Sequence, residues 1–400
     1  MFPRRVPPTR FLLLSLLALA IALTLAGCQG IQGGNTQQPG PQPGQNDGLP
    51  ATNSAVRRIV VIVMQNRSFN HLFGTFPGVN GISPGVNGYA QQDGSGNTVT
   101  PTLLTATSTA DLPHTHSSYL NTVNGGAMDQ FALNNGALSM QYDDNSIAGV
   151  DKLWSWAQQF ALADNYFNSV LSSAPASVLY MISASDNNFP FGVQPFYGPC
   201  NQPDAAAQPF TFPNVGDQLT QKGIDWGWFH ENYGQCGNGY IQQQNPFQYF
   251  TSTQNTPNLQ DLNAFEAKLA AGTLPPVSFI QGNPNHSTHP GSGSVTKALD
   301  WLDGLLQRIQ ASSAWPTVAV VVVWDESGGW WDHVSPPPVD SQGLGPRVPM
   351  LVISPLAKRG YVSHVQMDHV SILRFIQSNW GLPSLNARNS QSTDIRDMLQ

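Results

Sequence analysis

The chain has 400 residues, of which 40% are apolar and only 10% charged, with a formal net charge of −7 at pH 7. Nucleic-acid binding is excluded as a main function, because no stretch is rich in lysine or arginine. The apolar content is sufficient for a large core, and 37 glycines and 32 prolines indicate many loops.

The first 27 residues have the features of an export signal. Arg4, Arg5 and Arg10 precede an apolar stretch over 11–26, which is too short for a stable membrane helix. This stretch ends in Leu-Ala-Gly before Cys28 and so resembles a bacterial lipoprotein signal, whose cysteine becomes the lipidated first residue. A permanent N-terminal anchor helix is the alternative. Loss of the three arginines leaves 14 basic and 24 acidic side chains.

Residues 28–55 consist mainly of Gly, Pro, Gln and Asn, and a segment that buries so little apolar surface is expected to be a flexible tether. We expect one folded domain over 56–400. Its two cysteines, Cys200 and Cys236, leave two alternatives open: a disulfide, which an oxidising compartment would favour, or two unpaired thiols.

Four apolar runs of strand length stand out in this domain, and a polar cluster follows each of them. Because the runs show no alternation, the strands should be buried on both faces, as in a parallel sheet covered by helices. The runs are 59–63, 277–280, 318–324 and 350–353.

Helical patterns alternate with these strands. Apolar spacing predicts a helix over 298–310, Asp368 is expected to cap another that stops at Gly381, and Asp151 is expected to cap a third. We therefore predict an α/β fold with a central, mostly parallel sheet between helices. Ligands bind such sheets at the carboxyl ends of the strands, where the polar clusters lie.

The polar clusters contain side chains suited to catalysis or metal binding. Asp325 and Glu326 follow a buried strand, and two adjacent carboxylates repel each other unless a cation neutralises them. The alternative is that one of them faces outward and caps the next helix. His289 and His333 also follow strands, beside carboxylates or amides. We expect structural roles for three other histidines, His71, His364 and His369.

Seven segments of the chain resemble motifs of the bacterial phosphoesterase family, which includes phospholipases C and an acid phosphatase. The most specific of them reads Trp-Asp-Glu-Ser-Gly-Gly-Trp-Trp-Asp-His over 324–333. The segments occur in the family's order and together span roughly 56–385. They are 61–71, 111–114, 124–129, 245–247, 324–337, 345–349 and 353–355.

The resemblance implies an alkaline-phosphatase-like α/β fold with a metal-assisted phosphate-ester site. Asn66, Asp325 and Glu326 would hold a divalent metal ion of unspecified identity. Three histidines would surround the phosphate: His114, His289 and His333. A metal would activate the nucleophile and offset charge on the phosphoryl oxygens, while a histidine protonates the leaving alkoxide.

The sequence departs from the family pattern at the metal site, where Gln65 stands in place of the usual glutamate. An amide still offers a carbonyl oxygen, but it removes one negative charge. We therefore expect Gln65 to remain a metal ligand and the affinity to be weaker than in relatives, or the metal to be a different one.

A second departure affects the nucleophile. Gapless alignment with the family puts Ala174 in its place, whereas alignment on the following proline selects Ser173. We favour Ser173 and keep Ser172 and Ser177 as alternatives, together with the possibility that this loop contains no nucleophile.

The predicted function is hydrolysis of phosphate esters, including phospholipids, by a protein that is lipid-anchored to the bacterial cell envelope. The main alternative is a degenerate family member that binds a phosphorylated or sugar-like ligand without turnover, while an envelope lectin has little support. Recognition of choline would require an aromatic cage, and the candidates for it are Trp226, Trp228, Trp330 and Trp331.

Overall fold

The computed structural model describes residues 48–200 and 208–400. The predicted signal peptide over 1–27, the cysteine at position 28 and the tether up to residue 47 lie outside the described residues. Within the described ranges, no helix has the length and apolar character needed to span a membrane.

An eight-stranded sheet forms the core, with strand order β13-β6-β12-β11-β1-β10-β8-β9. The two central strands, β11 (Val318–Trp324) and β1 (Arg58–Met64), are buried along their whole length. The remaining six strands of the sheet are β6 (Ala161–Ala163), β8 (Trp226–His230), β9 (Leu259–Asp261), β10 (Val277–Gln281), β12 (Met350–Ile353) and β13 (Tyr361–Ser363). All four predicted strands are present, as β1, β10, β11 and β12.

The sheet is mostly parallel, as predicted, and only β12 runs antiparallel to its neighbours β11 and β6. This reversal corrects one expectation. Ser354, which follows β12, lies at the opposite edge of the sheet from the other polar clusters. The segment that precedes β12, with Arg347, lies instead at the edge where β1, β10 and β11 end.

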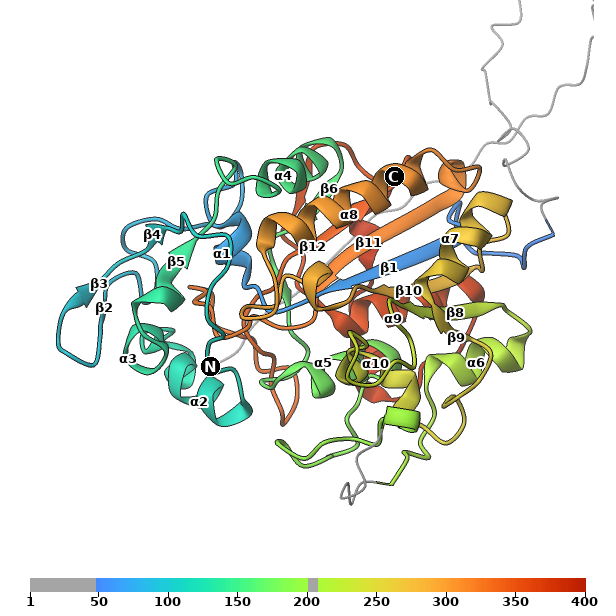
Figure 1. Ribbon diagram of the computed structural model, residues 1–400, viewed down its shortest axis with the longest axis horizontal. Coiled ribbons are helices and arrows are strands. Elements are labelled where there is room, and N and C mark those ends of the chain that lie inside the picture. Colours follow the sequence, from blue (N-terminus) through green and yellow to red (C-terminus); the bar gives the residue numbers. More distant parts are fainter. Residues whose placement is uncertain (1–47, 201–207) are drawn as a thin grey trace, which may run out of the picture. The chain divides into compact units, whose positions relative to one another are not determined.

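Helices cover both faces of the sheet (Figure 1). Helix α8 packs with α4, and α9 packs with α5. The longer helices are α2 (His116–Val123), α4 (Val150–Gln159), α5 (Ala174–Ser183), α6 (Val215–Lys222), α7 (Leu262–Ala271), α8 (Val295–Gln310) and α9 (His369–Trp380). Three shorter helices are α1 (Phe69–Phe73), α3 (Phe131–Asn135) and α10 (Ala387–Gln391).

The predicted helix ends are confirmed in one case and corrected in two. Helix α9 begins after Asp368 and ends at Gly381, which has a left-handed φ of 64°. Helix α8 begins at Val295, three residues before the predicted start. The cap of α4 is Gly149 and not Asp151, whose carboxylate lies in the first turn and accepts a hydrogen bond from the Gly149 N–H at 2.8 Å.

Short elements connect this framework. Three two-stranded pairs are β2 (Gln91–Gln92) with β3 (Thr98–Val99), β4 (Thr102–Leu103) with β5 (Gln141–Tyr142), and β7 (Tyr166–Phe167) with β14 (Met367–Asp368). The 3₁₀ turns η4 (Gln242–Gln244) and η5 (Pro246–Tyr249) belong to the site described below. The others are η1 (Asn124–Gly126), η2 (Ala137–Met140), η3 (Gly198–Cys200), η6 (Pro284–His286), η7 (Trp315–Thr317) and η8 (Ile395–Met398).

The two cysteines of the domain form a disulfide, Cys200–Cys236, which confirms the first of the two alternatives. Such bonds persist in oxidising compartments and are rare in the cytosol. The bond therefore indicates a location outside the cytosol.

The four tryptophans considered for an aromatic cage do not form one. Each is at most 2% exposed, so no face is open to a ligand. Trp226 and Trp228 lie on β8 and contact Phe247, with ring centroids 4.5 and 5.8 Å away. Trp330 packs against His71 at 3.8 Å. These tryptophans belong to the packed interior.

Candidate active site

A cavity of about 340 Å³ lies where β1, β10 and β11 end. Segments far apart in the chain meet there because parallel strands deliver their carboxyl ends to one edge of the sheet. The polar side chains around it include most of the predicted site. They are Gln65, Asn66, His114, Ser173, Gln243, Gln244, His289, Ser292 and Glu326.

Asn66 occupies the turn that leaves β1 and has a left-handed φ of 58°, a conformation that Asn tolerates better than most residues. Its backbone N–H donates to the Asp325 carboxylate at 3.0 Å, and its side-chain nitrogen donates to Glu326 at 2.9 Å. Gly328 leaves room for this turn, since a Cβ there would lie 2.5 Å from the Asn66 carbonyl oxygen. The chain thus accepts an uncommon backbone conformation to bring Asn66 against both acids.

The residue before His289 also has a strained, left-handed backbone conformation. Thr288 has a φ of 68°, a genuine outlier for a β-branched residue. Its hydroxyl donates to the Gln65 carbonyl at 2.7 Å and accepts from the Trp324 indole at 3.0 Å. These two contacts fix the loop after β10 against the ends of β1 and β11, and so set the position of His289.

Asp325 and Glu326 are both fully buried. Burial, with the neighbouring charge of Glu326, raises the pKa of Asp325 to about 7. No lysine or arginine pairs with either carboxylate within the described residues. Apart from His114, whose Nε2 lies 3.6 Å from a Glu326 oxygen, the two acids have no cationic partner among the described residues, and a bound cation would supply one.

Hydrogen bonds hold Glu326 firmly. One of its oxygens accepts from the Tyr119 hydroxyl and from the Gly328 N–H, the latter at 2.8 Å. The Tyr119 hydroxyl accepts in turn from Ser327 at 3.0 Å. Tyr119 was not singled out by the sequence, because a tyrosine on a short helix gives no signal of its distant partner.

Three amide oxygens beside these acids have no hydrogen-bond partner although they are buried: those of Gln65, Asn66 and Gln244. Leaving a buried acceptor unpaired costs about 1–3 kcal/mol. Carboxylate and amide oxygens are the ligands that hard divalent cations prefer. The donor set therefore fits a divalent metal ion, and Gln244 is a member of the group that the sequence analysis missed.

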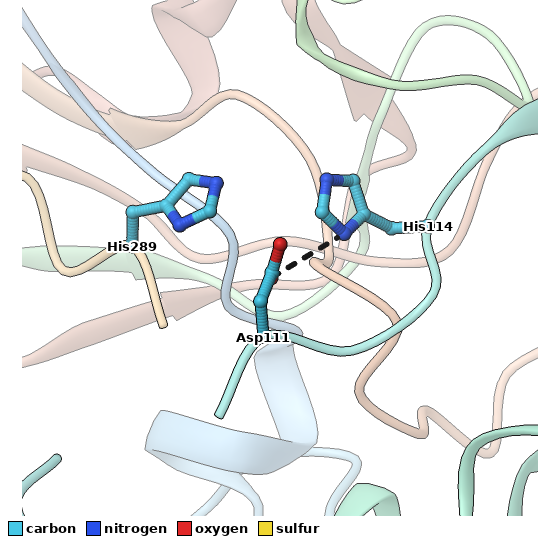
Figure 2. Close-up of side chains that lie close together, drawn as sticks. All are labelled: Asp111, His114 and His289. Carbon is cyan, nitrogen blue, oxygen red and sulfur yellow. Dashed lines mark ion pairs between the residues drawn. The ribbon is translucent and has the colours of Figure 1, made fainter. Parts of the chain in front are cut away.

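His114 and His289 also line the cavity, with Asp111 between them (Figure 2). Each ring bonds to a backbone carbonyl through Nδ1, His114 to Leu112 and His289 to Pro290, both at 2.6 Å. Since a carbonyl only accepts, both Nδ1 atoms carry a proton, and the His114 Nε2 lies 3.4 Å from the side-chain nitrogen of Asn66. The three side chains could hold a metal ion, since one ligand atom of each lies within 4.8 Å of the others. Asp111 belongs to a matched motif but was not predicted as a ligand.

The charge environment of His114 favours its protonated form. Burial lowers the pKa of His114, but the negative charges of Glu326 and Asp111 outweigh this effect and raise the pKa above its ordinary value. The Nε2 atom lies 3.6 Å from a Glu326 oxygen. His114 therefore holds a proton more strongly than an ordinary histidine does.

Of the three candidate serines, only Ser173 lines this cavity within the described residues. It caps the N-terminus of α5, and no hydrogen bond from α5 to its side chain is formed. Ser177 is buried in the helix, 3.4 Å from the Ser173 carbonyl. Ser172 lines an adjoining pocket that Ser173 and Gln243 also border, and Ala174 lies beside Ser173 in the cavity wall but has no nucleophilic group.

His333 does not join this group. Its two ring nitrogens lie 3.1 Å from the side-chain oxygens of Asn70 and Asn80. The neighbouring Asp332 forms a fully buried ion pair with Arg347 at 2.8 Å. The family resemblance implied a place for His333 near the phosphate, but its ring contacts a separate network of Asn70, Asn80 and Arg347.

The three histidines that were expected to be structural form hydrogen bonds or ion pairs with other groups of the protein. His71 lies 3.3 Å from Asp143, and His364 lies 2.8 Å from Asp164. His369 donates from Nε2 to the Asp325 carbonyl at 2.7 Å and so supports the turn behind the acids.

The fold and the site together define an α/β protein with buried acids and amides at the carboxyl edge of its sheet. The chain belongs to the phosphoesterase family, whose model matches residues 56–383. It is 26% identical over 389 residues to the non-hemolytic phospholipase C of Pseudomonas aeruginosa, covering 83% of this chain and 55% of that protein. It is 25% identical over 405 residues to phospholipase C A of Mycobacterium tuberculosis, covering 86% and 76%.

Among the solved structures that resemble the chain is a protein of the alkaline phosphatase superfamily from Vibrio parahaemolyticus. The TM-score is 0.40 at 10% identity, covering 82% of this chain and 79% of that one. The phosphonate monoester hydrolase of Agrobacterium radiobacter gives 0.41 at 9% identity, covering 86% and 77%. The chain spans only a little over half of the Pseudomonas phospholipase.

Proposed function

We propose that this protein hydrolyses phosphate esters, in the manner of a phospholipase C, with a divalent metal ion at the carboxyl edge of its sheet. The observation that carries the proposal is the convergence of Ser173, His114 and Glu326 on one cavity beside the buried Asp325. Membership of the phosphoesterase family and the names of the matched phospholipases support the same reaction class.

Gln65, Asn66, Asp325 and Glu326 are assigned as the residues that hold the metal. The unpaired amide oxygens of Gln65 and Asn66 and the two buried carboxylates fit a hard divalent cation. When bound, such an ion would polarise the phosphoryl group and lower the pKa of the attacking hydroxyl. Under this assignment Asp111→Asn leaves the metal content of the purified protein unchanged, whereas Asp325→Asn removes it.

Ser173 is assigned as the nucleophile. Its oxygen forms a bond to phosphorus while the bond from phosphorus to the alcohol oxygen breaks, giving a phosphoserine that water later hydrolyses. Ser173 stands at the N-terminus of the ten-residue α5, where the helix dipole favours negative charge on the phosphoryl oxygens.

His114 is assigned as the acid that protonates the leaving alkoxide. Glu326 and Asp111 keep its pKa raised, so that it carries the proton to be donated, and the Leu112 carbonyl fixes the ring. His289 lines the cavity beside His114 and is assigned to the phosphoryl oxygens.

The test is release of p-nitrophenol from p-nitrophenyl phosphate and p-nitrophenyl phosphorylcholine by the purified full-length protein. Activity that requires added Mn²⁺, is removed by EDTA and falls at least a thousandfold in Ser173→Ala supports the proposal. Ser177→Ala, a buried serine one helical turn away, is the matched control and should retain activity. Equal activity in Ser173→Ala and wild type would overturn the assignment.

The alternative, a family member that binds a phosphorylated ligand without turnover, is favoured by one observation. Gln65 places an uncharged amide where the family has a glutamate. Saturable binding of a phosphate ester, with no hydrolysis across Mn²⁺, Zn²⁺, Ca²⁺ and a range of pH, would establish this alternative.

We also propose that the protein is exported and anchored through lipidated Cys28. The disulfide supports an oxidising location, and the sequence before Cys28 supports a lipoprotein signal. Labelled palmitate should be incorporated into the wild-type protein expressed in bacteria and not into Cys28→Ser. A labelled Cys28→Ser protein would exclude this site.

A further inference from the structure

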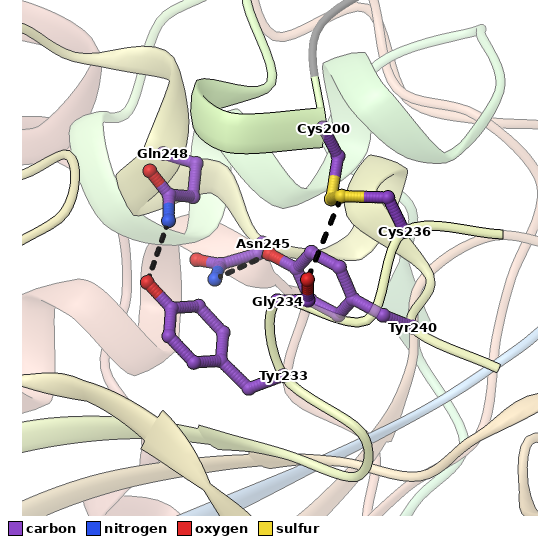
Figure 3. The surroundings of a disulfide bond; sticks show 7 residues. All are labelled: Cys200, Tyr233, Gly234, Cys236, Tyr240, Asn245 and Gln248. Carbon is purple, nitrogen blue, oxygen red and sulfur yellow. Dashed lines mark hydrogen bonds between the residues drawn. A yellow bond between two sulfur atoms is a disulfide. The ribbon is translucent and has the colours of Figure 1, made fainter. Parts of the chain in front are cut away.

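The segment that follows Cys236 forms one wall of the cavity, and the protein holds it in several places (Figure 3). The disulfide ties its start to Cys200. Further on, the Asn245 amide donates to the Tyr240 hydroxyl at 2.9 Å, and the Gln248 amide donates to the Tyr233 hydroxyl at 2.7 Å. These contacts fix the turn η4, which ends at Gln244.

Gln244 is fully buried, although glutamine is a residue that proteins usually leave at the surface. Its amide nitrogen donates to the Asp325 carboxylate at 2.6 Å. The other Asp325 oxygen accepts from the backbone N–H groups of Asn66 and Glu326. Gln244 is thus the partner of the one Asp325 oxygen that the backbone does not satisfy.

The amide oxygen of Gln244 is buried and has no hydrogen-bond partner, and the side chain borders the same cavity as Gln65, Asn66 and Glu326. With the nitrogen committed to Asp325, the oxygen of the same planar amide cannot turn toward the carboxylate. A buried acceptor in this position needs a donor or a cation.

We propose that Gln244 is a metal-binding residue, whose Oε1 joins the amide oxygens of Gln65 and Asn66 around the cation while its Nε2 orients Asp325. This inference rests on the metal site of the proposed function and adds a member to it from a different part of the chain. The set then comprises three neutral oxygens and two carboxylates. An all-oxygen set of this charge suits Mn²⁺, Mg²⁺ or Ca²⁺ better than Zn²⁺.

The experiment measures Mn²⁺ binding to the full-length protein by isothermal titration calorimetry, which does not depend on turnover. Gln244→Ala and the similarly sized Gln244→Met both lack the oxygen, and each should weaken Mn²⁺ affinity at least tenfold. Gln244→Glu supplies a carboxylate oxygen but loses the amide N–H that donates to Asp325, so its affinity should fall less than that of Gln244→Met. Gln243→Ala is the matched control, because Gln243 borders the cavity without contacting Asp325, and its affinity should stay within twofold of wild type.

Circular dichroism and thermal melting establish that each variant is folded. If Gln244→Ala fails to fold, Gln244→Met and Gln244→Glu carry the test. Wild-type affinity in Gln244→Met, equal weakening in Gln244→Met and Gln244→Glu, or no binding of Mn²⁺, Mg²⁺ or Ca²⁺ to the wild-type protein would each overturn the inference. Weaker binding in Gln244→Met than in Gln244→Glu supports it even if no ester is hydrolysed, a result that would count against the proposed activity alone.

Discussion

The sharpest prediction concerns the buried acid Asp325, whose replacement by asparagine should stabilise the metal-free protein. Burial and the charge of Glu326 raise the pKa of Asp325 from 3.8 to about 7. Each pKa unit corresponds to a free-energy difference of about 1.4 kcal/mol. Keeping Asp325 ionised in the folded protein therefore costs on the order of 4 kcal/mol.

The direction of the pH dependence follows from this raised pKa. Between about pH 4 and pH 7 the folded protein binds a proton at Asp325 that the unfolded chain has lost. The stability contributed by this group is therefore complete below about pH 4 and is lost as the pH rises to about 7. Asp325→Asn cannot ionise and should escape this loss.

The local hydrogen bonds allow the substitution. An asparagine oxygen can accept from the same two backbone N–H groups, those of Asn66 and Glu326. The asparagine nitrogen would then face Gln244, whose amide can turn so that its unpaired oxygen accepts. The expected gain in unfolding free energy at pH 8 is thus about 2–4 kcal/mol, below the full electrostatic value because the amides must rearrange.

The assay is urea unfolding in EDTA at pH 4 and at pH 8. Asp325→Asn should exceed wild type at pH 8 and match it at pH 4. Mn²⁺ at 1,000 times its Kd should stabilise the wild type by about 4 kcal/mol and so cancel or reverse the difference at pH 8, because the variant cannot bind it. A metal-free variant that is less stable than wild type at pH 8 would refute the reasoning.

Three further predictions concern the support of the site. Tyr119→Phe removes a donor to the buried Glu326 and should lower the unfolding free energy by about 2 kcal/mol, and a change below 0.5 kcal/mol in thermal melts would contradict this. Replacing both Cys200 and Cys236 by serine opens a link across 36 residues and should cost about 4 kcal/mol in urea unfolding, with an unchanged midpoint as the contrary result. Gln65→Glu restores a negative charge and should tighten Mn²⁺ binding at least tenfold in calorimetry, whereas equal affinity would show that this position does not limit binding.

The sequence predicted the strands of the core because long β-branched runs such as 318–324 have few alternatives to a buried strand. It also singled out Asn66, Glu326 and His114 through the family motifs that contain them, and His289 through its place after a strand, and these residues border one cavity. These features are local, or are carried by motifs read along the chain, and so they could be recognised without coordinates.

Features that depend on distant contacts could not be predicted in this way. The reversed direction of β12 depends on how the chain returns to the sheet, and an apolar run reads the same in either direction. His333 lies close to Asp325 in the chain, yet its two ring nitrogens contact the distant residues Asn70 and Asn80.

Gln244 is the clearest example of a residue whose role could not be predicted from the sequence. It lies 81 residues from Asp325 in the chain, inside a run of three glutamines that differ in nothing but position. The sequence determined which chemical groups are available and which segments become strands. Only the folded chain decided which groups meet at the acids, because burial, charge and hydrogen bonding act between neighbours in space.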